Sequence, residues 1–362
     1  MTPEARQRAW SIVRVALAVT LLAVLAGSGV IEWPRLKGLL HAWPLTLAAL
    51  ALLMLGLVLA SWRFCLLTAP RDLHVSLGNS VRLTLIGNAA NLVLPTIGSD
   101  LVRLWFAADG HAGRRTEIAT IVLLDRVLGL VGILLLPLVL APFFPGVVAA
   151  SPVIRWILGV SAAGALALLA AILVALSRRG LASAPVQFVL RVLPLGGYPR
   201  RILDTIHGYR RRSGALAAAV AWSVAANLCA ASCIVCLQMA THPGSAGPLG
   251  GFLTSLAFVL NNVPITPGGI GFTEAAVASL YSIAGLEGGA ETMLGMRVLF
   301  LLLAPVGVVL HVRGVRGYLT AGSATAPSSA TPGGDEGRTP SAASTATPAT
   351  PATPPTPATP LR

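Results

Sequence analysis

Acidic and basic side chains stand close together at two places in the sequence where the flanking residues are apolar. Asp100 and Arg103 are one helical turn apart in "NLVLPTIGSDLVRLW". Asp125 and Arg126 are adjacent in "IVLLDRVLGLVG". The guanidinium group of arginine is a planar fork of donors that matches phosphate oxygens, and a nearby carboxylate can orient it and balance its charge. The pattern therefore favours recognition of a phosphate-bearing group.

Helix-breaking residues accompany the first of these places and recur later in the chain, in "NNVPITPGGIGFTE". A helix that begins just after Gly98 would add backbone N–H groups to a phosphate site. Glu274 follows the later breakers, where it either caps the next helix or faces a cavity. We predict no catalytic residue and no metal ligand. The residues expected to line a polar cavity are Asn91, Pro95, Gly98, Asp100, Arg103, Asp125, Arg126, Asn262, Pro264, Gly268, Gly269, Gly271, Glu274 and Arg297.

A purely structural role is the alternative for the charged candidates. Asp100 and Arg103 could instead form a helix cap and an anchor at the membrane surface. Asp125 could pair with Arg126 or Arg297 only to hold helices together. A charged residue at the centre of a membrane helix costs about 2.5 to 3.5 kcal/mol on insertion scales. Both interpretations therefore predict partners for these charges.

Cysteine spacing suggests one further chemistry, which its context disfavours. Cys229, Cys233 and Cys236 reproduce the CxxxCxxC spacing by which some enzymes hold an iron-sulfur cluster. They lie in the hydrophobic stretch "NLCAASCIVCLQM", where small packing residues are the better interpretation. No glycine-rich phosphate loop follows a predicted strand, so nucleotide binding is not indicated. We expect no cofactor.

The candidate residues lie in a chain with the composition of an integral membrane protein. Of its 362 residues, 55% are hydrophobic and 11% are charged, against roughly 25% charged residues in a soluble domain. A helix needs about 20 apolar residues to cross the hydrocarbon core. An N-terminal secretory signal is disfavoured because further apolar runs follow the first at once. The sequence predicts an all-α polytopic protein with about six full spans, at residues 15–31, 44–62, 118–141, 157–176, 215–239 and 292–312.

Two interrupted regions, residues 76–107 and 252–286, do not fit this pattern. With roughly 30 residues each, they are too short for two full spans and a turn. We predict two re-entrant helix pairs that enter from opposite faces, so that hydropathy alone would report about eight helices. Backbone that leaves the helix inside a membrane is tolerated only where it is buried in protein or lines a polar cavity. Opposed broken helices also indicate an inverted repeat around a central binding site.

The distribution of charge indicates orientation and domain boundaries. The chain has 26 Lys and Arg against 13 Asp and Glu, a net charge of +13. The basic residues lie mostly outside the apolar runs, which is typical of cytoplasmic loops rather than of a nucleic-acid surface, and predicts cytoplasmic N- and C-termini. Residues 177–213 are strongly basic and form either interfacial helices or an ordinary cytoplasmic loop. We expect a transmembrane domain at 1–318 and a disordered Thr/Pro/Ala-rich cytoplasmic tail at 319–362.

Three ordered motifs, "NLVLPTIGSDLVRLW", "LLDRVLGLVGILLL" and "NNVPITPGGIGFTEAA", resemble the lysylphosphatidylglycerol synthase transmembrane-domain family. The resemblance covers about residues 8–318. It departs at Ser99, where many members have glycine, and at Thr273, where an arginine often precedes the glutamate. The positions that match the family motifs are Pro95, Gly98, Asp100, Arg103, Asp125, Arg126, Pro264, Gly268, Gly269, Gly271 and Glu274.

The resemblance implies a flippase-like protein of the bacterial inner membrane. Aminoacyl-transferring members of the family carry a soluble synthase domain after the membrane part. This chain continues into the tail instead, so we expect that it does not make lysyl lipids and is not an enzyme.

We therefore expect a lipid flippase or transporter. Arg103, Arg126 and Arg297 would neutralise an anionic or phosphate-bearing headgroup in the cavity while the acyl chains remain in lipid. One alternative is a membrane-embedded polyprenyl-lipid glycosyltransferase, which the absence of Asp and Glu from the predicted outer loops at 141–151 and 241–251 argues against. The other is a non-transporting partner of lipid-synthesis enzymes. Membrane lipids are the expected partners, lipid-biosynthesis enzymes and homo-oligomers are open alternatives, and nucleic acid is not expected.

Overall fold

The computed structural model of the protein describes residues 39–71, 73–94, 98–108, 114–177, 183, 205–244, 247–262, 271–312 and 320–321. The predicted first span at 15–31 lies outside the described residues. Residues 178–182 and 184–204 of the basic segment and the tail from residue 322 onward also lie outside them. The described residues all belong to one compact unit, Met1–Gly322, which we call the membrane unit.

Five helices within the described residues are long and apolar enough to cross a membrane. These helices correspond one to one with the five predicted spans that fall in the described part of the chain. This confirms a multi-pass, all-helical membrane protein. The five helices are α3 (Trp43–Thr68), α6 (Arg115–Leu140), α8 (Pro152–Leu176), α12 (Ser213–Thr241) and α15 (Gly289–Val312).

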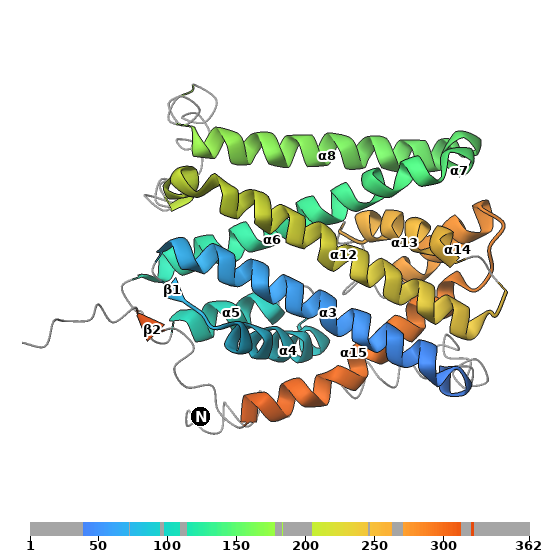
Figure 1. Ribbon diagram of the computed structural model, residues 1–362, viewed down its shortest axis with the longest axis horizontal. Coiled ribbons are helices and arrows are strands. Elements are labelled where there is room, and N and C mark those ends of the chain that lie inside the picture. Colours follow the sequence, from blue (N-terminus) through green and yellow to red (C-terminus); the bar gives the residue numbers. More distant parts are fainter. Residues whose placement is uncertain are drawn as a thin grey trace, which may run out of the picture. The chain divides into compact units, whose positions relative to one another are not determined.

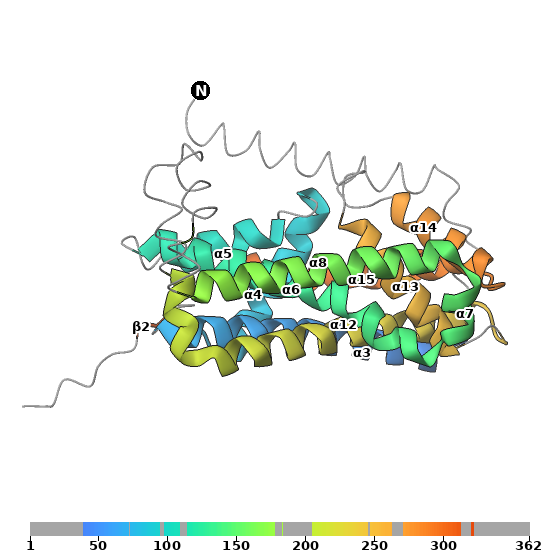
Figure 2. The ribbon, with the colours of Figure 1, turned by 90° about the horizontal axis from the view of Figure 1, so that it is seen from above.

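The two interrupted regions each form a pair of short helices. The first pair is α4 (Leu77–Val93) and α5 (Gly98–Ala108), with 17 and 11 residues. The second pair is α13 (Gly247–Asn261) and α14 (Phe272–Ile283), with 15 and 12 residues. Figures 1 and 2 place the first pair toward the end of the bundle where α3 ends, and the second pair toward the end where α15 begins. This arrangement is compatible with the prediction of two re-entrant pairs that enter from opposite faces.

Local sequence signals explain how the first pair forms. The Ser76 hydroxyl caps α4 by accepting the Asn79 N–H at 3.3 Å, and the helix ends just before Pro95, which cannot continue it. At the start of α5, a Cβ on Gly98 would lie 2.6 Å from the carbonyl group of Ala90. Only glycine permits this approach, so α5 folds back closely against α4.

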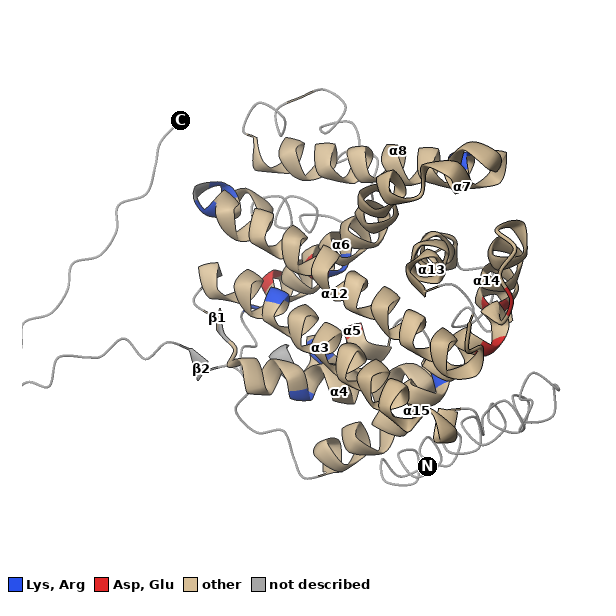
Figure 3. Ribbon diagram, turned by 45° about the vertical axis from the view of Figure 1, so that its right-hand side comes forward, with Lys and Arg blue, Asp and Glu red and all other residues tan. Residues whose placement is uncertain are grey.

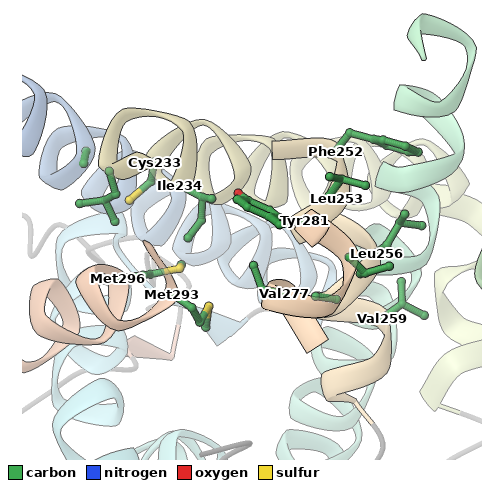
Figure 4. Packing of buried hydrophobic residues seen from close by; sticks show 14 of the residues in the cluster. Cys233, Ile234, Phe252, Leu253, Leu256, Val259, Val277, Tyr281, Met293 and Met296 are labelled. Carbon is green, nitrogen blue, oxygen red and sulfur yellow. The ribbon is translucent and has the colours of Figure 1, made fainter. Parts of the chain in front are cut away.

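Apolar packing holds the spans together. The rings of Trp62 on α3 and Trp222 on α12 stack with their centroids 4.9 Å apart. Figure 4 shows a buried apolar cluster in which α12, α13, α14 and α15 meet, with Ile234, Phe252 and Tyr281 among its members. A second cluster, which includes Phe64 and Leu128, joins α3, α6 and the start of α12.

Minor elements complete the described fold. A short helix, α7 (Pro145–Ala150), and three 3-10 turns, η1 (Ala69–Arg71), η3 (Ala141–Phe143) and η4 (Gly208–Arg212), lie at helix ends. The strands β1 (Leu73–His74) and β2 (Thr320–Ala321) pair antiparallel over two residues each. The expected all-α architecture holds apart from this small pair.

Candidate functional site

A cavity of about 760 Å³ lies among α3, α4, α5, α6, α12, α13 and α15. Residues that flank the breaks of both short-helix pairs contribute to its wall, namely Asn91 and Ser99 from the first pair and Asn261 and Asn262 from the second. Most of the remaining wall is apolar. The two breaks in the sequence therefore meet at one polar space, as backbone that leaves the helix inside a membrane requires.

The cavity lies near the middle of the spans. On α3 its wall residues, such as Leu57, fall between members of the first apolar cluster at Leu53 and of the second at Phe64. On α12 the wall residue Asn227 is the central residue of Ser213–Thr241. A binding site at mid-depth is the position at which transporters built from opposed broken helices hold their substrate.

One buried part of the wall is a cluster of three charged side chains from three helices. Asp125 on α6 accepts hydrogen bonds from Arg63 Nε at 2.7 Å, from Arg63 Nη2 at 3.1 Å and from Arg103 Nη1 at 2.5 Å. The exposed fractions are 3% for Asp125 and 8% for each arginine. One carboxylate thus holds two guanidinium groups, and the cluster keeps a net charge of +1.

Hydroxyl groups and one aromatic ring complete the surroundings of the two arginines. Arg103 Nη2 donates to Thr84 Oγ1 at 3.1 Å, and Arg63 Nη1 donates to Ser223 Oγ at 3.0 Å. The guanidinium carbon of Arg103 lies 4.9 Å from the centroid of the Phe64 ring. Buried charges are stable only when they are paired and hydrogen-bonded, and both conditions hold here.

A second ion pair on the wall is more exposed. Asp100 on α5 pairs with Arg126 on α6, and the Arg126 side chain is 52% exposed. Asp100 and Arg103, one turn apart on α5, therefore do not pair with each other, and each joins the oppositely charged residue of the Asp125–Arg126 sequence on α6. The two crossed ion pairs attach α5 to α6.

Arg297 pairs with Glu274 at the start of α14. The same carboxylate accepts the Gly271 N–H at 2.9 Å, and Gly271 has φ +81°, a conformation that favours glycine at this N-cap. Glu274 thus both caps α14 and binds the arginine of α15. Thr273 stands where the sequence motif would have an arginine before the glutamate, and Glu274 pairs with Arg297 of α15. The Thr273 hydroxyl donates to Asn261 at 2.6 Å.

Seven of the fourteen predicted site residues line the cavity. Gly98, Gly271 and Glu274 are described but are not among its lining residues, although Glu274 binds the lining residue Arg297. Pro95, Pro264, Gly268 and Gly269 lie outside the described residues. The seven that line it are Asn91, Asp100, Arg103, Asp125, Arg126, Asn262 and Arg297.

Sequence reasoning missed Arg63, and the alternative in which Asp125 pairs with Arg126 or Arg297 is wrong. Arg63 follows the apolar run at 44–62, where a basic residue is expected in a cytoplasmic loop, but α3 continues to Thr68 and buries it. Asp125 binds Arg63 and Arg103, whereas its predicted partners Arg126 and Arg297 form ion pairs with acidic residues elsewhere. The signal that was available is the apolar sequence "FCLL" after Arg63, which shows that the helix does not stop there.

Metal binding finds no support in the described part of the chain, which contains no group of three His, Cys, Asp or Glu able to hold a metal ion. Cys229, Cys233 and Cys236 lie on α12, and Cys233 belongs to the first apolar cluster. Figure 3 shows how few charged residues the described helices carry.

Fold and site define a multi-pass membrane protein with an arginine-rich cavity at mid-depth. The family model described as the lysylphosphatidylglycerol synthase TM region matches residues 11–303. The chain belongs to this family, which confirms the resemblance carried by the three motifs. No curated protein matches the chain. No solved structure matches it either.

Proposed function

We propose that this protein is a lipid flippase or transporter that moves an anionic, phosphate-bearing lipid across the bacterial inner membrane. The observation that carries the proposal is the cavity of about 760 Å³, whose wall places four arginines among apolar residues inside the bundle. A headgroup needs polar, positively charged surroundings to leave water, and acyl chains need none. Membership in a family of lipid-related membrane proteins supports the same function.

The four arginines have different parts in this mechanism. Arg63 and Arg103 stay bound to Asp125, so they act on a headgroup through the positive charge of their cluster. Arg126 is half-exposed on the wall and is placed to exchange its bond with Asp100 for a phosphate. Arg297 is positioned by Glu274 on the part of the wall that α15 supplies. Guanidinium groups suit this role because they bind phosphate in a fixed planar geometry.

We also propose that both termini are cytoplasmic and that the protein catalyses no chemical reaction. Positive charge near the spans supports a cytoplasmic location for both termini. A glycosyltransferase would need a carboxylate able to act as a base, but the two aspartates of the described wall, Asp100 and Asp125, are both held by arginines. This observation supports transport over the transferase.

Leaflet accessibility in proteoliposomes tests the proposal. Phosphatidylglycerol in the outer leaflet is cleaved by periodate at its vicinal diol, and phosphatidylethanolamine is labelled by an amine reagent that does not cross the bilayer. If the protein exchanges either lipid between leaflets, the accessible fraction rises toward the whole pool. Liposomes without protein set the background.

Arg126→Ala is the matched variant for this assay. We expect it to slow exchange by roughly tenfold or more, because one charge-assisted hydrogen bond to the headgroup is lost. Arg155→Ala is the control, since Arg155 is an exposed arginine on α8 away from the cavity. Equal rates for wild type and Arg126→Ala would refute the role of Arg126. No exchange of either lipid would overturn the transport proposal in favour of a non-transporting partner.

A further inference from the structure

Five asparagines line the cavity in addition to its charged residues. They come from both short-helix pairs and from the middle of α12, and they are Asn88, Asn91, Asn227, Asn261 and Asn262. An amide is uncharged and offers two donor and two acceptor positions. Polar groups inside a membrane bundle are costly unless they have polar partners, so this set indicates a polar occupant of the cavity.

Hydrogen bonds anchor one end of each amide. Asn227 and Asn262 donate to main-chain carbonyls one turn earlier, at 2.8 and 2.7 Å, and Asn88 donates to a carbonyl of α15 at 3.4 Å. Asn91 accepts a main-chain N–H of α5 at 3.0 Å, and Asn261 accepts a threonine hydroxyl at 2.6 Å. The first three thus keep an acceptor oxygen for a ligand, and the last two keep donor NH₂ groups. A ligand that both donates and accepts, as hydroxyl groups do, matches this mixed set.

The carboxylates near the cavity are all engaged by arginines within the described residues. Asp125 binds two guanidinium groups, Asp100 binds one, and Glu274 binds one and caps α14. The stretches at the two turns that lie outside the described residues, 95–97 and 263–270, contain no Asp or Glu. Four arginines against Asp100, Asp125 and Glu274 leave these described groups with a net charge of +1. An ammonium group would therefore meet positive charge and no available carboxylate.

We propose that the cavity selects a lipid whose phosphate carries a neutral, hydroxyl-rich headgroup, such as glycerol or a sugar, and disfavours headgroups that carry an ammonium. The arginines bind the phosphate, and the amides bind the hydroxyls. The inference rests on the proposed function in one respect, namely that the cavity receives a lipid headgroup. It goes further by naming the chemistry of that headgroup.

Lipid binding in detergent tests this selectivity without requiring transport. The midpoint of thermal unfolding, Tm, of the purified full-length protein is measured against rising concentrations of three lipids with identical acyl chains. These are phosphatidylglycerol, its lysyl ester and phosphatidylethanolamine. A ligand that binds the folded state raises Tm according to its affinity. We expect phosphatidylglycerol to bind at least roughly tenfold more tightly than either ammonium-bearing lipid. Equal or tighter binding of either of these, or binding of none of the three, would overturn the inference.

Two substitutions test the contributions of the amides and of the arginines to lipid binding separately. Asn227→Leu removes an amide at nearly constant volume and should weaken binding of phosphatidylglycerol roughly three- to tenfold. Asn79→Leu, at the exposed start of α4, is the matched control and should leave it unchanged. Arg126→Gln releases Asp100 and should weaken binding of phosphatidylglycerol while it strengthens binding of phosphatidylethanolamine. Tighter binding of phosphatidylethanolamine cannot arise from misfolding. Weaker binding of both lipids would contradict the argument.

Comparison with the leaflet assay distinguishes the two proposals. Selective binding of phosphatidylglycerol without exchange would support the headgroup chemistry and overturn transport. Exchange that is as fast for phosphatidylethanolamine as for phosphatidylglycerol would support transport and overturn the selectivity.

Discussion

Asp125 is the residue on which the buried charges of the cavity depend. Its carboxylate is the acceptor for guanidinium groups from α3 and α5, so three helices meet at one side chain. Asp125 is 3% exposed, and the solvent screening that weakens surface ion pairs is largely absent. Removing the carboxylate would leave two buried cations without a counter-charge.

Asp125→Asn should therefore destabilise the protein strongly. Breaking a buried ion pair by removal of one partner costs about 3 to 5 kcal/mol. The measurement is the free energy of unfolding, or the shift in Tm, in detergent. Glu117→Gln is the control, because the Arg114–Glu117 pair is partly exposed and should be worth about 1 kcal/mol or less. Similar effects of the two substitutions would show that the Asp125 cluster does not stabilise the fold.

Glu274 combines two roles that substitution can separate. Glu274→Gln keeps a side-chain oxygen able to accept the Gly271 N–H but removes the charge that pairs with Arg297. We expect a loss of stability of about 1 to 3 kcal/mol from the weakened bond to a charged group. Glu274→Ala should cost about 1 kcal/mol more because the cap is also lost. Equal stability of the two variants would show that the cap contributes nothing.

At the scale of elements, the α4–α5 pair determines the shape of the cavity. The close approach of α5 to Ala90 brings Asp100 and Arg103 to face α6, where the two crossed ion pairs form. The pair is also tied to α3, because the Ser80 hydroxyl donates to the Ser61 carbonyl at 2.9 Å. A change that separates α4 from α5 should therefore weaken the two crossed ion pairs between α5 and α6 as well as the packing.

Gly98→Ala tests this dependence. The new Cβ would lie 2.6 Å from the main chain of Ala90, so the helices must move apart, at a cost of about 1 to 3 kcal/mol. Gly78→Ala is a control near the start of α4, where an added Cβ meets nothing within 4 Å. This control should be neutral or slightly stabilising, because alanine favours helix over glycine. Tm and the leaflet exchange rate should both fall for Gly98→Ala, and no fall in either would contradict the packing argument.

At the scale of the whole molecule, spans and short-helix pairs place one polar space inside an apolar bundle. The long helices supply most of the apolar surroundings, and the residues that flank the breaks of the two pairs supply polar groups from opposite ends. This division accounts for a site near mid-depth without a long polar span. The described wall residues all belong to the membrane unit.

Removal of Ser323–Arg362 should leave the stability of the protein and the proposed lipid exchange unchanged. The truncated protein keeps the whole membrane unit, Met1–Gly322, including the β1–β2 pair. We expect exchange rates and Tm within error of the full-length protein. A large loss of exchange at unchanged Tm would assign the tail a part in transport, contrary to its composition.

Much of the architecture followed from local patterns. Apolar runs of sufficient length predicted five spans that the structure contains, and proline and glycine clusters predicted both breaks. These predictions succeed because hydropathy and helix breaking depend on residues that are adjacent in sequence. The same patterns indicated five of the six charged residues of the described cavity wall, all except Arg63, since charges within apolar runs require a polar environment.

Only the tertiary structure decided which charges are partners. Asp125 joins Arg63, 62 residues earlier, and Arg103, 22 residues earlier, and Glu274 joins Arg297 as well as its own helix cap. Several pairings were compatible with the sequence, because helical spacing relates residues on one helix but not the faces that different helices present to each other. The packing of α5 against α4 and α6 selects one set. For the same reason Arg63 belongs to the site although its position in the sequence is that of an ordinary basic residue at a helix end.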